Sequence, residues 1–294
     1  MQVAPWVPQQ LLPALPTPPP FSAHDINRAH QALVQNKYRR ELRVRDPDEL
    51  DQDPAQFAEL VVIGRSNVGK SSLLNAMWRQ EGLAPCSKTP GRTQTFDLYT
   101  TPAVPELRVM DVPGYGFARA PRSVVFDWHA KLSAYLNDRG QELLGRVYVL
   151  LDARRGVTQK DREVLEVLAA STATYQLVLT KADTLTPTRL REVVAALQSE
   201  VGADPKYVGC YPALHLVSSA KDFGLKELRA SFCAAALLID APLSQMELAG
   251  SDDGGVSLDE EGDSIFGLQK LSKADKGRLL PAVDPSEADG SKGA

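Results

Sequence analysis

A chain of 294 residues is long enough for one domain with terminal extensions or for two small domains. Apolar residues make up 43% of it, enough for a full core, but no apolar run is long enough to span a bilayer. The three cysteines form no CxxC pair, which argues against a disulfide framework and fits a reducing compartment. The net charge is −4 and residues 241–294 alone carry −6, so the remainder is mildly basic. That balance permits contact with RNA without indicating it.

The first residues predict little regular structure. Residues 1–21 are apolar and rich in proline, which breaks helices, so we expect them to be disordered. Met1–Pro20 carries no charge and therefore lacks both the basic start of a secretory signal and the arginine-rich pattern of an organelle presequence. Residues 22–56 predict a helix that Ser22 caps, followed by a charged linker.

Residues 57–240 alternate between short apolar runs and amphipathic stretches, which indicates a mostly parallel sheet covered by helices. The apolar runs predict strands at Leu60–Ile63, Leu107–Met110, Val147–Leu151, Leu177–Leu179 and Leu214–Val217. Helical patterns lie near Ser71–Trp78, Val124–Leu136, Asp161–Ala170, Leu190–Val201 and Leu225–Leu238. Phe96–Thr100 predicts a hairpin partner of the second strand. The expected sheet therefore has six strands, with one antiparallel strand at its edge and helices on both faces. Residues 241–294 turn acidic and rich in glycine and serine, so we expect a disordered tail.

A phosphate-binding pattern follows the first of these strands directly. Residues 64–71 read GRSNVGKS, which is G-x-x-x-x-G-K-[ST] between a strand and a helix, the setting that a P-loop requires. Glycines let the backbone wrap a phosphate, and the loop N–H groups with the helix N-terminus face the anion. Lys70 can reach the β and γ phosphates, and the Ser71 hydroxyl can bind Mg²⁺. The pattern predicts a P-loop NTPase fold with a Ras-like G domain.

Two further patterns stand where adjacent strands end. Asp111-Val112-Pro113-Gly114 closes the second strand, so the Asp111 carboxylate can hold Mg²⁺ through water and the Gly114 N–H can meet the γ phosphate. Thr180-Lys181-Ala182-Asp183 closes the fourth strand. A buried Asp183 carboxylate would accept both the N1–H and the N2–H₂ of guanine, whereas adenine offers an acceptor there. The Lys181 stem would pack along the base, and Ser218-Ser219-Ala220 stands where a last loop can touch it.

Taken together, these segments resemble the EngB (YihA/YsxC) family of ribosome-biogenesis GTPases, one of the TrmE-Era-EngA-EngB-septin-like P-loop GTPases. The matching segments are GRSNVGKSS from Gly64, KTPGRTQT from Lys88, DVPGYGFA from Asp111, TKAD from Thr180 and SSA from Ser218. The resemblance covers roughly residues 57–238, and the long acidic tail departs from the compact family pattern.

The resemblance implies a GTP hydrolase that uses Mg²⁺ and takes part in assembly of the large ribosomal subunit, with rRNA and ribosomal proteins as partners. In bacterial relatives it is also linked to division and septation. It implies that Thr93 is the switch I threonine that closes on Mg²⁺ and the γ phosphate, although by sequence alone Thr89, Thr93 and Thr95 are equal candidates. Lys70, Thr93 and Gly114 would act on the transferred phosphoryl group. The expected nucleotide contacts are Gly64, Arg65, Ser66, Asn67, Val68, Gly69, Lys70, Ser71, Ser72, Gly91, Arg92, Thr93, Gln94, Thr95, Asp111, Val112, Pro113, Gly114, Thr180, Lys181, Ala182, Asp183, Ser218, Ser219 and Ala220.

Two residues bear on catalysis. Ras-type GTPases orient the attacking water with a glutamine directly after DxxG, but here that residue is Tyr115, so we expect slow intrinsic turnover. Asn67 offers a hard oxygen ligand for K⁺ beside the phosphates, as in several related GTPases, or it merely caps the loop backbone. The metal ligands expected are thus Ser71, Thr93 and Asp111 for Mg²⁺, with Asn67 for K⁺.

Rival functions and the compartment stay open at this stage. One rival is a GTP-dependent binding module with negligible catalysis, and another is a GTPase with a non-ribosomal partner. We expect a monomer that is neither secreted nor embedded in a membrane. The absent presequence favours a bacterial cytoplasm, whereas Gly209–Pro212 and the N-terminal helix look more like eukaryotic members and favour a mitochondrion or plastid.

Overall fold

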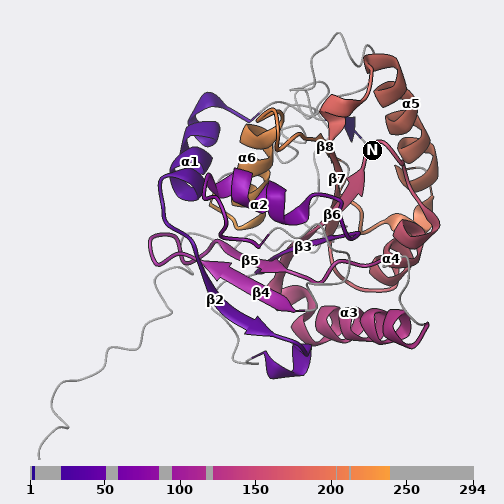
Figure 1. Cartoon of the computed structure of the whole chain (residues 1–294), viewed down its shortest axis with the longest axis horizontal. Coiled ribbons are helices and arrows are strands. Elements are labelled where there is room, and N and C mark those ends of the chain that lie inside the picture. Colours follow the sequence, from indigo (N-terminus) through magenta and orange to yellow (C-terminus); the bar gives the residue numbers. More distant parts are fainter. Residues whose placement is uncertain are drawn as a thin grey trace, which may run out of the picture. The chain divides into compact units, whose positions relative to one another are not determined.

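The computed structural model describes residues 2–3, 21–50, 59–85, 95–116, 122–202, 204–211 and 213–238. Its helices and strands alternate along the chain, as the sequence predicts (Figure 1). The strands are β1 (Gln2–Val3), β2 (Arg39–Val44), β3 (Glu59–Gly64), β4 (Phe96–Thr100), β5 (Arg108–Asp111), β6 (Leu144–Asp152), β7 (Tyr175–Thr180) and β8 (Ala213–Leu216). The α-helices are α1 (Ala23–Val34), α2 (Lys70–Trp78), α3 (Arg122–Leu143), α4 (Gln159–Ala169), α5 (Pro187–Leu197) and α6 (Leu225–Ala235).

The described strands form one sheet in the order β1-β8-β7-β6-β3-β5-β4-β2. All five predicted apolar runs lie in its parallel centre, because β3 pairs with β5 and β6, β6 with β7, and β7 with β8. These strands are buried on both faces, which is why they read as continuous apolar runs. This arrangement is the mostly parallel α/β sheet that the sequence predicts for a P-loop NTPase.

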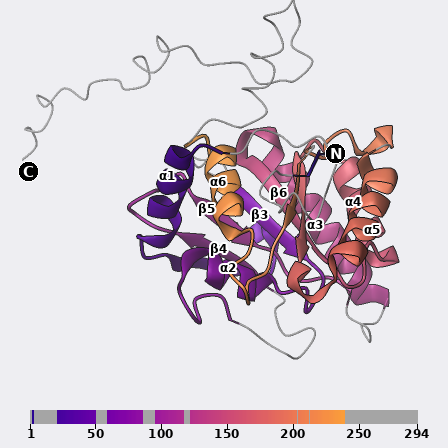
Figure 2. The same cartoon turned by 90° about the horizontal axis from the view of Figure 1, so that it is seen from above.

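Helices cover both faces of the sheet, as predicted (Figure 2). One buried cluster joins the sheet to α1, α2 and α6 through residues such as Leu33, Trp78 and Phe232. A second cluster joins the opposite face to α3, α4 and α5 through residues such as Leu132 and Leu165. Burial of two apolar layers against one sheet is the main stabilising contribution to such a domain.

The predicted sheet edge is wrong. β4 does pair antiparallel with β5, as expected, but it is not an edge strand because β2 pairs antiparallel with its other side. β2 was missed because Arg39–Val44 reads RRELRV, which contains no apolar run; most of its side chains are exposed. At the opposite edge Gln2–Val3 pairs with β8, inside the segment expected to be disordered. The described sheet therefore has eight strands rather than six.

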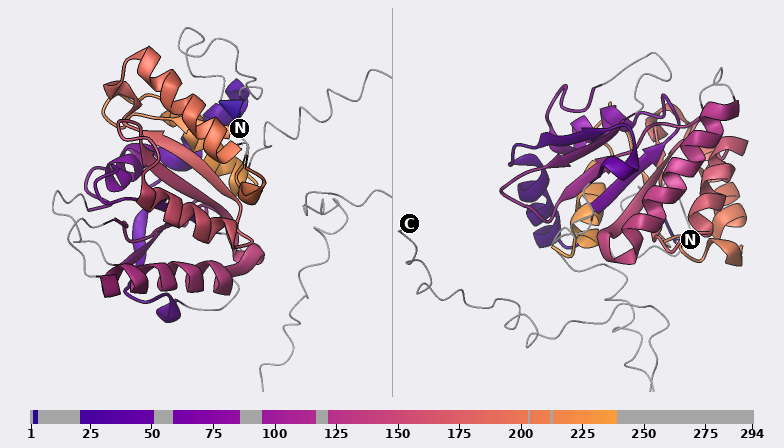
Figure 3. Two further views of the ribbon diagram at one scale, coloured as in Figure 1. Left: turned by 90° about the vertical axis from the view of Figure 1, so that its right-hand side faces the viewer. Right: turned by 90° about the horizontal axis from the view of Figure 1, so that it is seen from below.

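The predicted N-terminal helix is confirmed as α1. Ser22 caps it through a capping box, in which the Ser22 hydroxyl accepts from the Asp25 N–H and the Asp25 carboxylate accepts from Ser22. Its apolar face, with Ala29 and Leu33 fully buried, packs beside α6 (Figure 3). The helix is therefore part of the folded core and not an appended arm.

Several expectations fall outside the described residues. They include residues 4–20, residues 51–56 of the predicted linker and the acidic tail at 241–294. Within the ranges that the structure describes, no helix is both long and apolar enough to cross a membrane. The two cysteines in those ranges, Cys210 and Cys233, are free thiols.

Candidate functional site

The phosphate-binding loop lies between β3 and α2, as the sequence predicts. β3 ends at Gly64 and α2 begins at Lys70. The turn uses two left-handed residues, Asn67 with φ 66° and Gly69 with φ 104°. Glycine tolerates that conformation without steric cost, whereas asparagine is one of the few other residues that visits it. The first turn of α2 carries no acidic residue, so its N-terminus can face an anion.

The DVPG loop is hydrogen-bonded onto the P-loop. The Ser66 N–H donates to the Tyr115 carbonyl at 2.9 Å, and the Tyr115 N–H donates to the Gly64 carbonyl at 3.3 Å. A Cβ on Gly114 would come within 3.2 Å of both the backbone nitrogen and the hydroxyl of Ser66. Glycine at 114 therefore permits the two loops to touch. The prediction that Asp111-Val112-Pro113-Gly114 lies beside the P-loop is confirmed.

Lys70 and Asp111 form a buried ion pair beneath these loops. Their charged atoms are in direct contact, and both side chains are almost wholly shielded from solvent. Burial raises the pKa of Asp111, while the ammonium of Lys70 opposes that shift. The Asp111 carboxylate and the hydroxyl of Ser71, which follows Lys70 in α2, are hard oxygen donors of the kind that Mg²⁺ prefers, so the residues fit that ion.

A second buried carboxylate, Asp97, lies on the strand next to that of Asp111. Asp97 on β4 is the register partner of Asp111 on β5, and directly opposed residues share one face of a sheet. Arg43 on β2 compensates its charge with a two-pronged contact, Nε to Oδ1 at 2.7 Å and an Nη to Oδ2 at 2.6 Å. Through this contact β2, the strand that the sequence analysis did not predict, supplies a positive charge to Asp97 beside the predicted metal site.

The TKAD segment is tied to the P-loop from the other side. The Thr180 hydroxyl donates to the Val68 carbonyl at 2.8 Å, and the Lys181 ammonium donates to the Asn67 carbonyl at 2.6 Å. The Ala182 N–H in turn donates to the Val217 carbonyl at 3.1 Å, which places the Ser218 loop beside TKAD. The fold thus assembles the P-loop, DVPG, TKAD and SSA segments into one connected set of loops.

The expected burial of Asp183 is wrong. Its side chain is exposed, as is Ala220, whereas Ser218 is buried. Asp183 follows the strand end within a short 3₁₀ turn, Ala182–Thr184, and this turn presents the carboxylate to solvent. An exposed carboxylate at this place is open to a ligand, and desolvation would come with the bound base.

The switch I segment lies largely outside the described residues. This holds for Gly91, Arg92, Thr93 and Gln94, as well as for Thr89. Of the three candidate threonines only Thr95 is described, and its hydroxyl donates to Asp97 at 3.1 Å.

Tyr115, which stands where Ras-type GTPases have glutamine, points into the core. Its hydroxyl donates to Oδ1 of Asp161 at 2.8 Å, and both side chains are buried. Asp161 also accepts from the N–H and hydroxyl of Thr158 and so caps α4. Burial, followed by the charge of Asp161, raises the pKa of Tyr115 well above its usual value, so the phenol is a neutral donor.

A second contact holds the DVPG loop from the side of α3. Trp128 donates from Nε1 to the Pro113 carbonyl at 2.9 Å. The sequence analysis predicted neither the Tyr115–Asp161 bond nor the Trp128–Pro113 bond. The Thr158-x-x-Asp161 pattern could have indicated that Asp161 caps the first turn of a helix.

Comparisons with known proteins agree with this geometry. A family model described as a 50S ribosome-binding GTPase matches residues 59–181. The probable GTP-binding protein EngB of Rhodopseudomonas palustris (strain BisA53) is 44% identical over 178 residues, covering 60% of this chain and 80% of that protein. The namesake protein of Ruegeria pomeroyi (strain ATCC 700808 / DSM 15171 / DSS-3) is 44% identical over 176 residues, with 60% and 78% covered. The chain belongs to the EngB family.

A solved structure supports the fold of this EngB-family member. The crystal structure of a probable GTP-binding protein engB covers 62% of this chain and 100% of its own, with a TM-score of 0.50 and 18% identity. Like the other proteins of this class, the chain is a P-loop GTP hydrolase. The predicted family and enzyme class are therefore confirmed.

The Tyr115 anchor gives this EngB-family enzyme a testable feature. Tyr115→Phe removes one donor from a buried carboxylate, so the free energy of unfolding should fall by about 2 kcal/mol. Single-turnover GTP hydrolysis should stay within about twofold of wild type, because the hydroxyl contacts Asp161 in the core and not the loops that face the phosphate. Urea denaturation and rapid-quench hydrolysis measure the two effects.

The matched control is Tyr38→Phe. The Tyr38 side chain is also buried, but its hydroxyl donates to the uncharged Ala32 carbonyl at 3.2 Å, so the loss should be nearer about 1 kcal/mol. A Tyr115→Phe protein that unfolds normally but hydrolyses GTP much more slowly would place the phenol at the reacting phosphate instead.

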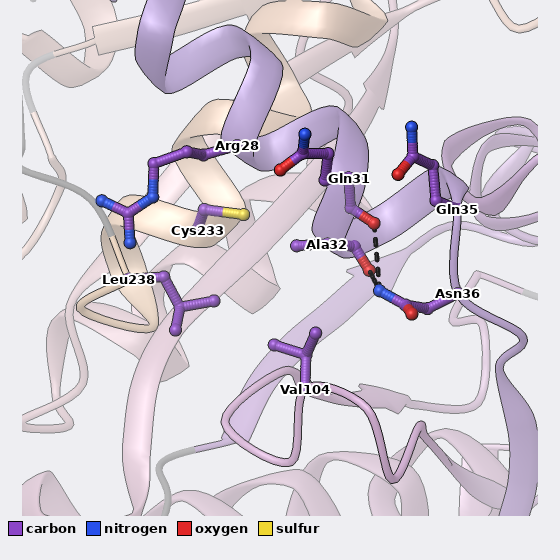
Figure 4. Close-up of a pocket in the computed structure, with 8 residues that line it drawn as sticks. All are labelled: Arg28, Gln31, Ala32, Gln35, Asn36, Val104, Cys233 and Leu238. Atoms are coloured by element: carbon purple, nitrogen blue, oxygen red, sulfur yellow. Dashed lines mark hydrogen bonds between the residues drawn. The ribbon is translucent and has the colours of Figure 1, made fainter.

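A separate cavity of this EngB-family chain lies away from the motif loops, between α1 and α6 (Figure 4). Arg28, Cys233, Leu238 and Val104 line it. At its rim the Asn36 amide donates to two backbone carbonyls of α1 and closes that helix. None of the lining residues belongs to a motif, so the cavity takes no part in the nucleotide site.

Proposed function

We propose that this EngB-family GTPase acts in the assembly of the large ribosomal subunit, with rRNA and ribosomal proteins of the precursor as its partners. The observation that carries the proposal is the match of residues 59–181 to the family described as a 50S ribosome-binding GTPase. The segment contains the P-loop, the switch region and the start of TKAD, which are the parts that sense the nucleotide.

We propose a role for each site residue toward Mg²⁺·GTP. Lys70 would contact the β and γ phosphates, Ser71 and Asp111 would hold the ion, and the Gly114 N–H would meet the γ phosphate. Asp183 and Lys181 would bind the guanine, with the Ser218 loop at the base edge. Mg²⁺ would neutralise charge at the phosphates, and the resemblance assigns Thr93 of switch I as its further ligand.

Partner exchange at Lys70 supports a nucleotide-driven switch. In the structure Lys70 contacts Asp111. A bound triphosphate offers the ammonium its own oxygens, which frees the Asp111 carboxylate for the metal. Because the DVPG loop is hydrogen-bonded to the P-loop, that exchange would act directly on the loop that contains Gly114 and Tyr115. GDP and GTP would both draw Lys70 away from Asp111, but only GTP brings the γ phosphate that the Gly114 N–H would meet. Ribosomal affinity would therefore differ between the GTP-bound and GDP-bound states.

Co-sedimentation tests the ribosomal role. The protein is mixed with purified large and small ribosomal subunits in the presence of a non-hydrolysable GTP analogue, GDP or neither nucleotide. We expect it to pellet with the large subunit when the analogue is bound and to be released with GDP. Equal recovery with both subunits, or with none, would contradict the proposal and leave a GTPase of another partner.

Tyr115 bears on the rival of a binding module with slow catalysis. Its hydroxyl is fixed to Asp161, so it cannot orient the attacking water. We propose that intrinsic hydrolysis is slow and that the ribosomal particle accelerates it. Single-turnover hydrolysis with and without large subunits measures the acceleration; equal slow rates would favour the binding module.

We further propose that Asn67 binds K⁺ beside the phosphates. Asn67 is exposed and left-handed at the tip of the P-loop, and no residue other than Asn67 in this loop offers a carboxamide. A K⁺ there adds positive charge where the transition state gathers negative charge, so hydrolysis should be at least about tenfold faster in K⁺ than in Na⁺ at equal ionic strength. Asn67→Ala should remove the difference. Equal wild-type rates in both salts would leave Asn67 as a simple cap of the loop.

A further inference from the structure

We infer that Asp152, at the end of β6, is a positioning residue for guanine-nucleotide binding that acts by holding Lys181 of TKAD against the P-loop. The Lys181 ammonium lies 2.9 Å from Oδ2 of Asp152 and 2.6 Å from the Asn67 carbonyl. Asp152 belongs to none of the motifs, yet it supplies the charged half of this two-point attachment.

The place of Asp152 in the sheet explains why it can do so. β6 lies between β3, which leads into the P-loop, and β7, which leads into TKAD. Asp152 is the register partner of Thr180, and the Ala153 N–H donates to the Thr180 carbonyl at 3.0 Å. Ligands of open α/β sheets bind outside the carboxyl ends of the strands, and Asp152 stands at that edge.

The Asp152 carboxylate is built to stay charged. Burial alone would raise its pKa, but bonds from Arg154 and Lys181 outweigh burial and lower the pKa to about 2. Arg154 donates from Nε and an Nη at 2.8 and 2.7 Å, and its N–H adds a third bond. Arg154 therefore contacts the carboxylate at the exposed surface, and Lys181 contacts the same carboxylate beside the Asn67 carbonyl of the P-loop.

Holding Lys181 matters because its side chain is long and its backbone is strained. Lys181 has φ 57°, a conformation that non-glycine residues seldom adopt except where the surroundings enforce it. A free lysine loses rotamer entropy when a ligand orders it. Here the side chain already lies along the P-loop, with Cε 3.7 Å from where a Cβ on Gly69 would stand. A pre-ordered stem lowers the entropic cost of binding the base.

The test is a double-mutant cycle on nucleotide affinity. Asp152→Asn should raise the dissociation constants of GDP and GTP about tenfold, and by equal factors, because the lost contact orders the base side and not the γ phosphate. In a Lys181→Met background the same change should have less than about a twofold effect, since the residue through which Asp152 acts is gone. Stopped-flow dissociation of fluorescent GDP and GTP gives these values.

Arg154→Gln is the matched control. It removes the other cation on the same carboxylate but leaves the contact with Lys181, so both affinities should stay within about twofold of wild type. Should Asp152→Asn fail to fold, as circular dichroism would reveal, Asp152→Ser in the same two backgrounds keeps the cycle measurable.

Two results would overturn the inference. One is an Asp152 effect of the same size with and without the Lys181 side chain, which would mean that Asp152 acts through the fold alone. The other is a loss confined to GTP, which would place its influence at the γ phosphate. The ribosomal proposal is independent of either result, because the cycle is measured without ribosomal particles.

Discussion

Lys70→Ala should abolish GTP turnover and weaken nucleotide binding by more than about a hundredfold. The proposed role of the ammonium is charge-assisted contact with two phosphates, and each such bond is about twice as strong as a neutral one. No other cation of the described P-loop is bonded to Asp111. Isothermal titration with GDP and GTP, together with phosphate release, measures both losses.

The same change should destabilise the nucleotide-free protein, because it leaves the buried Asp111 carboxylate without its partner. Removing one member of a buried ion pair costs about 3–5 kcal/mol. Lys70→Ala/Asp111→Asn should recover most of that stability without recovering binding. Lys206→Ala serves as control, since Lys206 pairs with Asp204 at the surface. Normal turnover in Lys70→Ala would refute the P-loop assignment.

Asp183→Asn should exchange one nucleotide specificity for another. The substitution turns one acceptor oxygen into a donor that faces the donors of guanine, so GTP and GDP affinity should fall by at least about tenfold. Xanthine carries a carbonyl oxygen in place of the guanine amino group, so xanthine nucleotides should gain affinity. Competition of GDP and XDP against a fluorescent guanine nucleotide measures the change.

A suitable control for this exchange is Asp204→Asn. Asp204 is a partly exposed carboxylate, 39% accessible, at the start of a 3₁₀ turn, but it lies in the loop before β8. The Asp204→Asn substitution should leave the affinities for GDP and XDP unchanged. Unaltered GTP binding in Asp183→Asn would remove this residue from the base site.

The sequence predicts the parallel centre of the sheet because burial on both faces leaves a simple trace. The runs that contain Leu60, Val147 and Leu177 are apolar at every position, and each becomes a central strand. β2 leaves no such trace. β2 pairs with β4 and its Arg43 bonds Asp97, which is 54 residues away in the chain, and no local pattern encodes such a pairing.

The same difference, between features that a local pattern encodes and features that depend on distant residues, applies to the site. Motif residues such as Lys70 and Asp111 are predictable because phosphate and Mg²⁺ chemistry requires those residue types at fixed spacing. The residues that hold them in place are not. Asp161 meets Tyr115 across 46 residues and Asp152 meets Lys181 across 29, so each pairing exists only once the strands have been ordered. Helix ends are likewise uncertain: the predicted helix to Val201 ends at Leu197 and continues as a single π turn.

The strand β2 has a consequence for solubility. Without residues 39–44, β4 would present an open row of N–H and C=O groups, a template for intermolecular pairing. Four charged residues of β2 are exposed along the edge that it forms: Arg39, Arg40, Glu41 and Arg43. Such charges disfavour further strand addition. A chain that begins at residue 57 would therefore keep every nucleotide motif and still aggregate, because it would lack the charged strand β2 that covers the edge of β4.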